Sequence, residues 1–115
     1  MSVSYKRYVV DIDGTICIPG KTEDTRYTGA LPIEDRIGKI NRLYDEGHII
    51  IYLTARGMGR HKNSRMLAHK EFYDFTYNQL KEWGCKFHEL HLGKPTADYY
   101  IDDRAVSDTT FFGQS

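Results

Sequence analysis

The apolar residues of this chain follow two patterns, which predict strands and helices in alternation. Apolar runs at residues 6–11 and 48–54, and an apolar–polar alternation at 86–92, predict three strands. A shorter run at 97–101 predicts a fourth strand. The run at 48–54 is continuously apolar and rich in β-branched residues, which is typical of a strand buried on both faces of a parallel sheet.

Apolar side chains at helical spacing lie between these strands. A first helix is predicted over 32–47, because Pro32 suits the first turn of a helix and Gly47 suits its end. Its inner stripe consists of Ile33, Ile37, Ile40 and Tyr44. A second helix is predicted over 64–83, with a break near Lys70.

Strands and helices in this order predict an open α/β sheet with flanking helices in a single domain, residues 1–115. Right-handed crossovers would place the second and third strands on one side of the first. If the fourth strand returns to the other side, the strand order is 3-2-1-4. The carboxyl ends of the first and fourth strands are then neighbours at the point where such sheets bind ligands.

Two further segments complete the predicted organisation. The stretch at 16–31 has a turn signal at Pro19-Gly20 and a second leg at 27–29, which predicts a small hairpin flap over the ligand site. Residues 104–110 predict one or two last turns of helix.

Composition narrows the class of protein. The 16 basic and 16 acidic residues balance, which gives no support for a general nucleic-acid binder. Cys17 and Cys85 are too few for a disulfide framework, so we expect two free thiols in a reducing, cytoplasmic setting. No run approaches the roughly 18 apolar residues of a membrane span, and no apolar region follows the charges of the N-terminus.

The first predicted strand ends in two carboxylates, in the sequence Asp11-Ile12-Asp13-Gly14-Thr15. Two aspartates one residue apart repel each other and gain little from packing, so we expect a cation beside them. Gly14 has no Cβ and permits the sharp turn that would expose both acids. At ordinary residue usage of roughly 5–7%, such a pattern arises by chance in about one chain in a thousand of this length.

Four motifs in this chain, in order, are similar to those of the haloacid dehalogenase superfamily. They are Asp11-Ile12-Asp13-Gly14-Thr15, Thr54 at the end of the second strand, Lys94 within Gly93-Lys94-Pro95, and Asp102-Asp103 after the fourth strand. The first motif has the D-x-D-G-[TV] form of the phosphatase branch. The resemblance implies a Rossmann-like core, and the short segments between the motifs leave no room for a cap domain.

The resemblance also implies a role for each motif residue. Asp11 would be the nucleophile that forms an aspartyl-phosphate, and Asp13 would protonate the leaving oxygen and then activate water. Thr54 and Lys94 would bind the phosphoryl oxygens, and Lys94 would also restrain Asp11. Mg²⁺ would be held by the Asp11 carboxylate, the Asp13 backbone carbonyl and Asp102.

Two residues compete for a further place at this metal. Asp103 directly follows Asp102, whereas Asp108 lies at a spacing that other members of the superfamily use. We favour Asp103 as a ligand or as a residue that supports Asp102, with Asp108 on the surface of a helix.

Basic and glycine residues gather in the loop at 55–63, after the second strand. The basic side chains could bind a second anionic group of a substrate, or they could form a solvated surface. The spacing of a P-loop and its Lys-Ser/Thr pair are missing. We expect substrate contacts from Gly14, Thr15, Ala55, Arg56, Arg60 and Lys62.

The resulting hypothesis is a Mg²⁺-dependent phosphomonoester hydrolase that acts through an aspartyl-phosphate. A small phosphorylated metabolite such as a sugar phosphate is the expected substrate, on family analogy, with a neighbouring subunit of a homo-oligomer covering the site. The alternatives are a phosphatase of nucleic-acid ends or of proteins, and a non-catalytic phosphate-binding module.

Overall fold

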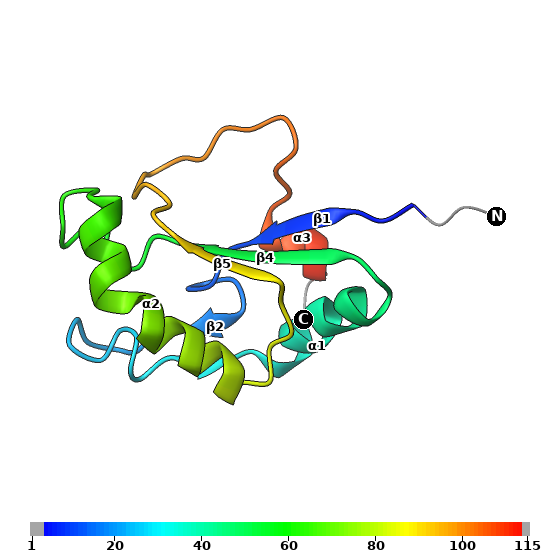
Figure 1. The fold of residues 1–115 in the computed structure, drawn as a ribbon, viewed down its shortest axis with the longest axis horizontal. Coiled ribbons are helices and arrows are strands. Elements are labelled where there is room, and N and C mark those ends of the chain that lie inside the picture. Colours follow the sequence, from blue (N-terminus) through cyan, green and yellow to red (C-terminus); the bar gives the residue numbers. More distant parts are fainter. Residues whose placement is uncertain (1–3, 114–115) are drawn as a thin grey trace.

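A three-stranded parallel sheet lies at the centre of the computed structural model, which describes residues 4–113 (Figure 1). Its strands are β1 (Arg7–Val10), β4 (Ile49–Thr54) and β5 (Glu89–Leu92), in the order β1-β4-β5. Arg7 pairs with Ile49, and Ile51 pairs with Glu89. The first three predicted strands and their relative order are therefore confirmed, although β5 is shorter than the alternating pattern suggested.

The predicted flap lies between β1 and the first helix. It begins with β2 (Cys17–Ile18), which pairs in antiparallel fashion with β3 (Leu31–Pro32). The second leg predicted at 27–29 is therefore wrong. Pro32 lies in β3 and not in a helix, because the backbone N–H of Ile33 donates to the carbonyl of Ile16 at 2.8 Å and keeps this segment beside the first leg.

In the described part of the chain, three helices accompany the sheet: α1 (Glu34–Asp45), α2 (Arg65–Glu82) and α3 (Asp108–Phe112). The hydroxyl of Ser64 caps α2 by accepting from the backbone N–H of Leu67 at 3.4 Å. The helix is continuous, so the predicted break near Lys70 is wrong. Within residues 4–113, no helix combines the length and the apolar character that crossing a membrane requires.

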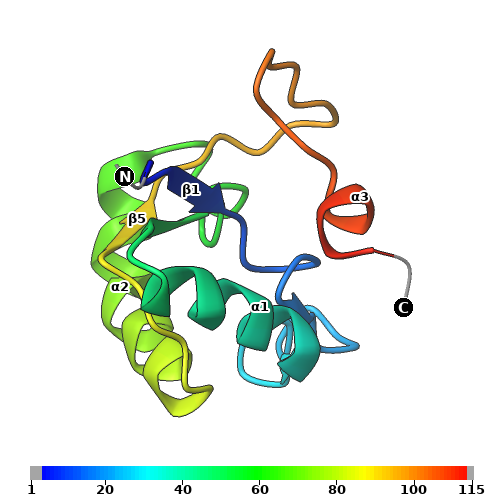
Figure 2. The same ribbon diagram turned by 90° about the vertical axis from the view of Figure 1, so that its right-hand side faces the viewer.

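The hydrophobic core lies on one face of the sheet. Ile50 and Tyr52 of β4 are fully buried and share one cluster with Ile40 of α1 and Leu80 of α2. The alternate residues of β4 are only half-buried, and Val9 of β1 is 61% exposed. The prediction of burial on both faces is wrong because α1 and α2 lie on the same side of the sheet (Figure 2).

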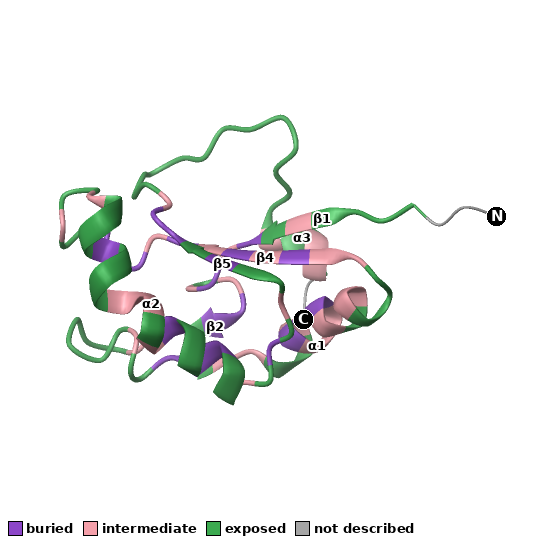
Figure 3. Cartoon of the chain, in the orientation of Figure 1, coloured by how far each residue is buried: buried purple, intermediate pink, exposed green. Residues whose placement is uncertain are grey.

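Residues 97–101 form no strand, so the predicted fourth strand is wrong. They belong to an exposed loop between β5 and α3, in which Ile101 is 97% exposed (Figure 3). Parallel strands need a connection of about a dozen residues or more, whereas only residues 93–96 separate β5 from this segment. Within the described residues, β1 consequently has β4 as its one strand partner.

The short helix α3 is tied to α1 and β1. Arg36 Nη1 donates to Asp108 Oδ2 at 2.7 Å, and the guanidinium of Arg36 lies 4.8 Å from the centre of the Phe112 ring. Phe111 packs against Tyr8 of β1, with ring centres 6.0 Å apart. The prediction that Asp108 lies on a helix surface is confirmed, although this helix begins later than residue 104.

We expect Asp108→Asn to lower the melting temperature slightly at pH 7, and to lower it progressively less as the pH falls below about 4. The hydrogen bond from Arg36 holds the pKa of Asp108 below its usual value. The pair therefore stabilises the fold above about pH 4, the ordinary pKa of aspartate, and this contribution disappears as the pH falls through the lower pKa of the folded state.

The pair is partly exposed, so its contribution should stay below about 1 kcal/mol. Thermal unfolding of both proteins at several pH values measures it. An equal loss of stability at pH 3 and pH 7 would contradict the ionic origin.

Candidate active site

A cavity of about 950 Å³ opens at the carboxyl ends of β1 and β4. Seven residues that the sequence predicted as functional line it: Asp11, Asp13, Thr54, Ala55, Arg56, Arg60 and Lys94. They come from segments far apart in the chain, and the parallel sheet brings them to one edge. The rest of the wall comes largely from the flap, from α2 and from the loop at 55–63.

Asp11 follows β1 directly and makes two side-chain contacts. Lys94 Nζ lies 3.3 Å from Asp11 Oδ1, and the hydroxyl of Thr15 donates to Oδ2 at 3.1 Å. The backbone N–H of Lys94 donates to the carbonyl of Thr54 at 3.2 Å, which fixes the chain after β5 to the end of β4. Three of the four predicted catalytic residues are thus joined in one contact network.

Asp13 is turned toward the cavity by the residues on either side. Ile12 has no exposed surface, and its carbonyl accepts from the backbone N–H of Ile16 at 2.9 Å. Gly14 adopts a φ of 83°, in the left-handed region that favours glycine. The buried isoleucine and the tight turn together leave the side chains of Asp11 and Asp13 in the wall of the same cavity.

Arg56, which the sequence predicted as a substrate contact, lines the cavity and pairs with Asp13. Its side chain is fully buried, and its Nε and Nη2 donate to the two carboxylate oxygens of Asp13 at 2.9 and 3.0 Å. The third nitrogen, Nη1, donates to the hydroxyl of Thr76 on α2 at 3.3 Å. A guanidinium inside the fold needs such a partner, because an unpaired buried charge is strongly destabilising.

Cys17 also contacts Asp13. Its thiol lies 3.5 Å from Asp13 Oδ1 and 3.6 Å from the carbonyl of Ile12. Burial, and secondly the negative charge of Asp13, raise the pKa of Cys17 to about 12. The thiol therefore stays protonated at neutral pH and acts as a weak donor to the carboxylate.

The remaining basic residues of the loop differ in their positions. Arg60 lies at the rim of the cavity, where its Nη1 donates to Glu71 on α2 at 2.7 Å. Lys62 is exposed and does not line the cavity. The structure thus brings Arg60, but not Lys62, to the place where a substrate would lie.

The predicted metal ligands at the fourth motif lie outside the cavity. Asp102 and Asp103 belong to the exposed loop, and the backbone N–H of Arg104 donates to Asp102 at 2.8 Å. That hydrogen bond is the main reason why the pKa of Asp102 is lowered. Among residues 4–113, no group of three or more histidine, cysteine, aspartate or glutamate side chains is close enough to bind a metal ion.

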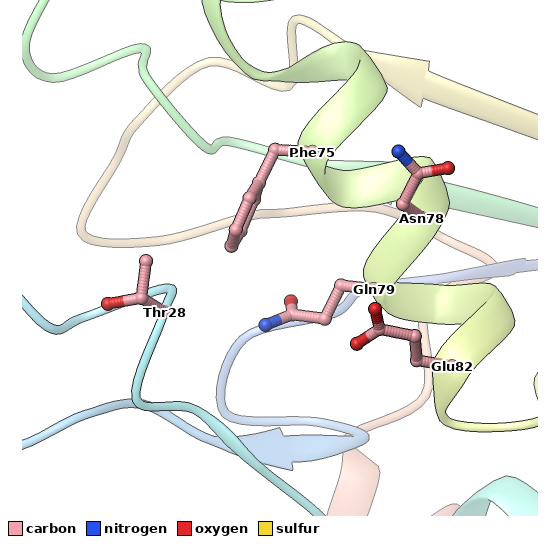
Figure 4. Close-up of a pocket in the computed structure, with 5 residues that line it drawn as sticks. All are labelled: Thr28, Phe75, Asn78, Gln79 and Glu82. Carbon is pink, nitrogen blue, oxygen red and sulfur yellow. The ribbon is translucent and has the colours of Figure 1, made fainter.

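Several residues of this site had no sequence signal of function. Tyr27 of the flap stacks against Arg56, and Gln79 Nε2 of α2 donates to the Tyr27 carbonyl at 2.7 Å. Figure 4 shows Gln79 extending from α2 toward the flap, beside Phe75 and Thr28, around a smaller hollow of about 200 Å³. Thr76 of α2 is fully buried, and its hydrogen bond to Arg56 depends on the fold.

Comparison with known proteins identifies a protein of similar structure, but it does not identify an activity for this chain. No family model and no curated protein matches the chain. The chain is similar to a crystal structure of a target protein from Vibrio cholerae, at 28% sequence identity and a TM-score of 0.83. The match covers 96% of this chain and 89% of the other. Fold and cavity thus define a small α/β protein with a carboxylate and lysine site at its strand ends.

Proposed function

We propose that the protein is a Mg²⁺-dependent phosphomonoester hydrolase of the haloacid dehalogenase superfamily, with a Rossmann-like core and no cap domain. The observation that supports this proposal best is the arrangement of four residues. Asp11, Asp13, Thr54 and Lys94 lie far apart in the sequence and line one cavity. Their chemistry matches the needs of phosphoryl transfer, which are a nucleophile, a proton donor and positive charge.

In the proposed reaction, a carboxylate oxygen of Asp11 attacks the phosphorus atom and the bond to the ester oxygen breaks. Asp13 gives a proton to the leaving oxygen. A water molecule then attacks the phosphorus of the aspartyl-phosphate and passes a proton to Asp13, which releases inorganic phosphate and restores Asp11. Each half of the reaction thus uses the same two carboxyl groups.

Lys94 and Thr54 would hold the phosphoryl group during both steps. The ammonium of Lys94 lies 3.3 Å from Asp11, so it can also contact an oxygen of a phosphate bound there. The hydroxyl of Thr54 accepts a hydrogen bond from the backbone N–H of Arg56 at 3.1 Å. Its own proton remains available for a phosphoryl oxygen.

The residues of the cavity fit Mg²⁺ in part. The Asp11 carboxylate and the backbone carbonyl of Asp13 are hard oxygen donors of the kind this ion prefers, whereas Asp102 and Asp103 lie outside the cavity wall. When bound, the ion would reduce the repulsion between Asp11 and the phosphate dianion. Tyr100 already lines the cavity, with its ring 4.3 Å from Lys94 Nζ. Asp102 follows only two residues later, and the proposal requires the loop to move so that Asp102 reaches Asp11.

We expect Mg²⁺ together with inorganic phosphate to slow tryptic cleavage after Arg104 by roughly tenfold, because the loop at 95–107 would close over the cavity. Cleavage after Lys6, in the exposed segment before β1 and outside the cavity wall, serves as a control within the same digest. Asp102→Asn should remove the protection at Arg104. Equal cleavage rates with and without the ion would argue against any contribution of this loop to the metal site.

A small phosphorylated metabolite is the proposed substrate. The cavity is large enough for a sugar phosphate, and its wall combines the rings of Tyr27, Phe72 and Phe75 with polar groups. The balanced net charge of the chain does not favour a nucleic-acid substrate. Both cysteines are buried free thiols, which supports a reducing cytoplasmic location. A second subunit that covers part of the surface would bury exposed apolar side chains such as Val9 and Ile101.

A panel of phosphate esters, assayed with and without Mg²⁺, tests this function. Sugar phosphates, 5′- and 3′-phosphorylated oligonucleotides and phosphopeptides separate the substrate classes. The proposal expects Mg²⁺-dependent turnover that is fastest with small esters. Fastest turnover of oligonucleotides with a strong salt dependence would favour the nucleic-acid alternative. Phosphate binding without turnover of any ester would favour a non-catalytic module.

A further inference from the structure

Arg56 is a permanently charged side chain with no exposed surface. Each of its three guanidinium nitrogens already has a partner within the protein, two on Asp13 and one on Thr76. These bonds use three of the five N–H groups of the guanidinium, and the two strongest of them are made to one carboxylate. The contacts of Arg56 therefore indicate a function carried out through Asp13.

The flap also contacts Arg56. The guanidinium carbon of Arg56 lies 4.8 Å from the centre of the Tyr27 ring, within cation–π distance. The hydroxyl of Tyr27 accepts from the backbone N–H of Gly57 at 3.2 Å, and the Tyr27 carbonyl accepts from Gln79. The Tyr27 ring also meets Phe72 edge-on, with ring centres 5.2 Å apart. Tyr27 is thus anchored at both its ring and its backbone.

This arrangement restricts Asp13 to one orientation. A planar guanidinium that donates to both carboxylate oxygens aligns the plane of the carboxylate with its own. A carboxylate has about four lone-pair positions, and Arg56 occupies two of them. The others remain for the thiol of Cys17 and for the cavity that Asp13 lines. Proton transfer depends strongly on such alignment, because donor and acceptor must be within hydrogen-bond reach.

We propose that Arg56 is a positioning residue that fixes the orientation in which Asp13 transfers its proton, and that Tyr27 of the flap holds Arg56 in place. This inference rests on the proposed phosphatase function. In this inference the flap contributes to proton transfer through the contacts Tyr27–Arg56–Asp13. Arg56 then acts on Asp13 and does not bind the substrate.

The test compares two esters whose leaving groups differ in their need for a proton. An alkyl phosphate releases a basic alkoxide and needs the acid, whereas p-nitrophenyl phosphate releases a stable phenolate and hardly needs it. For Arg56→Lys, we expect kcat/KM to fall about 10- to 100-fold with the alkyl phosphate and less than about 3-fold with p-nitrophenyl phosphate, since general acid catalysis contributes about 10²–10⁴-fold. Tyr27→Ala should also lower kcat/KM more with the alkyl phosphate than with p-nitrophenyl phosphate, but by a smaller factor than Arg56→Lys.

The conservative Arg42→Lys on the exposed face of α1 is the matched control and should leave both values unchanged. Circular dichroism and thermal unfolding show whether each variant is folded. A parallel loss with both esters through KM would mean that Arg56 binds the phosphate group and would overturn the proposal. Unchanged values for Arg56→Lys would overturn it as well.

A second measurement does not depend on activity and separates this inference from the proposed function. In the wild-type protein, the Nε–H of Arg56 should exchange slowly with solvent in nuclear magnetic resonance spectra, because it is buried and bound to Asp13. Asp13→Asn should shift that resonance and speed the exchange. If the wild-type protein hydrolyses no ester, the phosphatase proposal is wrong. Rapid exchange of this proton in the wild-type protein would show separately that Arg56 is not bound to Asp13 in solution, which would overturn the inference about Arg56.

Discussion

Asp11→Asn is expected to abolish turnover of every phosphate ester, with a loss of at least about 10³-fold in kcat. Asparagine has nearly the same shape as aspartate and can still accept the hydrogen bond from Thr15, so the fold should persist. Its amide is not a nucleophile, and no aspartyl-phosphate can form on it. Residue 11 would also lose the charge that faces Lys94.

The measurement is single-turnover hydrolysis with the best ester of the panel, together with mass spectrometry of the trapped protein. A phosphoryl adduct should appear on a peptide containing Asp11 in wild type and be absent from the variant. Asp35→Asn, on the exposed face of α1, is the control for loss of one carboxylate and should retain full activity. Substantial activity in Asp11→Asn would exclude the covalent mechanism.

Ile12→Ala should cause the largest loss of stability among single changes at the site, about 2–5 kcal/mol from removal of a fully buried isoleucine. The side chain of Ile12 has no exposed surface and belongs to the main core cluster. A loss of this size is a large part of the roughly 5–15 kcal/mol that holds a typical domain together. Urea unfolding of variant and wild type gives the difference in the free energy of unfolding.

Ile12→Val removes a single methylene group and is the graded control, with an expected loss of about 0.5–1.5 kcal/mol. Because Ile12 lies between Asp11 and Asp13, we also expect Ile12→Ala to lower kcat under conditions where the protein remains folded. Equal stability of the alanine variant and wild type would show that this side chain is not part of the core.

The sequence was most informative where a pattern has a local physical cause. Helical spacing predicted α1 and α2, and the apolar runs predicted β1 and β4. The clustering of Asp11, Thr54 and Lys94 also followed from the sequence, because parallel strands end at one edge of a sheet.

The errors concern segments whose structure depends on distant partners. Residues 97–101 have the composition of a strand, but strand pairing requires a connection of sufficient length, which the pattern of apolar residues does not reveal. Arg56 was predicted as a substrate contact, and the basic side chains of its loop were expected either to bind an anionic group or to be solvated. Its burial depends on three partners that come from three separate segments, Asp13, Tyr27 and Thr76.

The topology of the sheet has a consequence for the kinetics of folding. β1 and β5 both pair with β4, and each pairing joins residues roughly forty positions apart in the chain. Neither pairing can therefore form from contacts between residues that are close in sequence. The entropic cost of closing such long loops must be met before strand pairing can stabilise the chain. Since β4 takes part in both pairings, the transition state for folding should be organised around Ile50 and Tyr52.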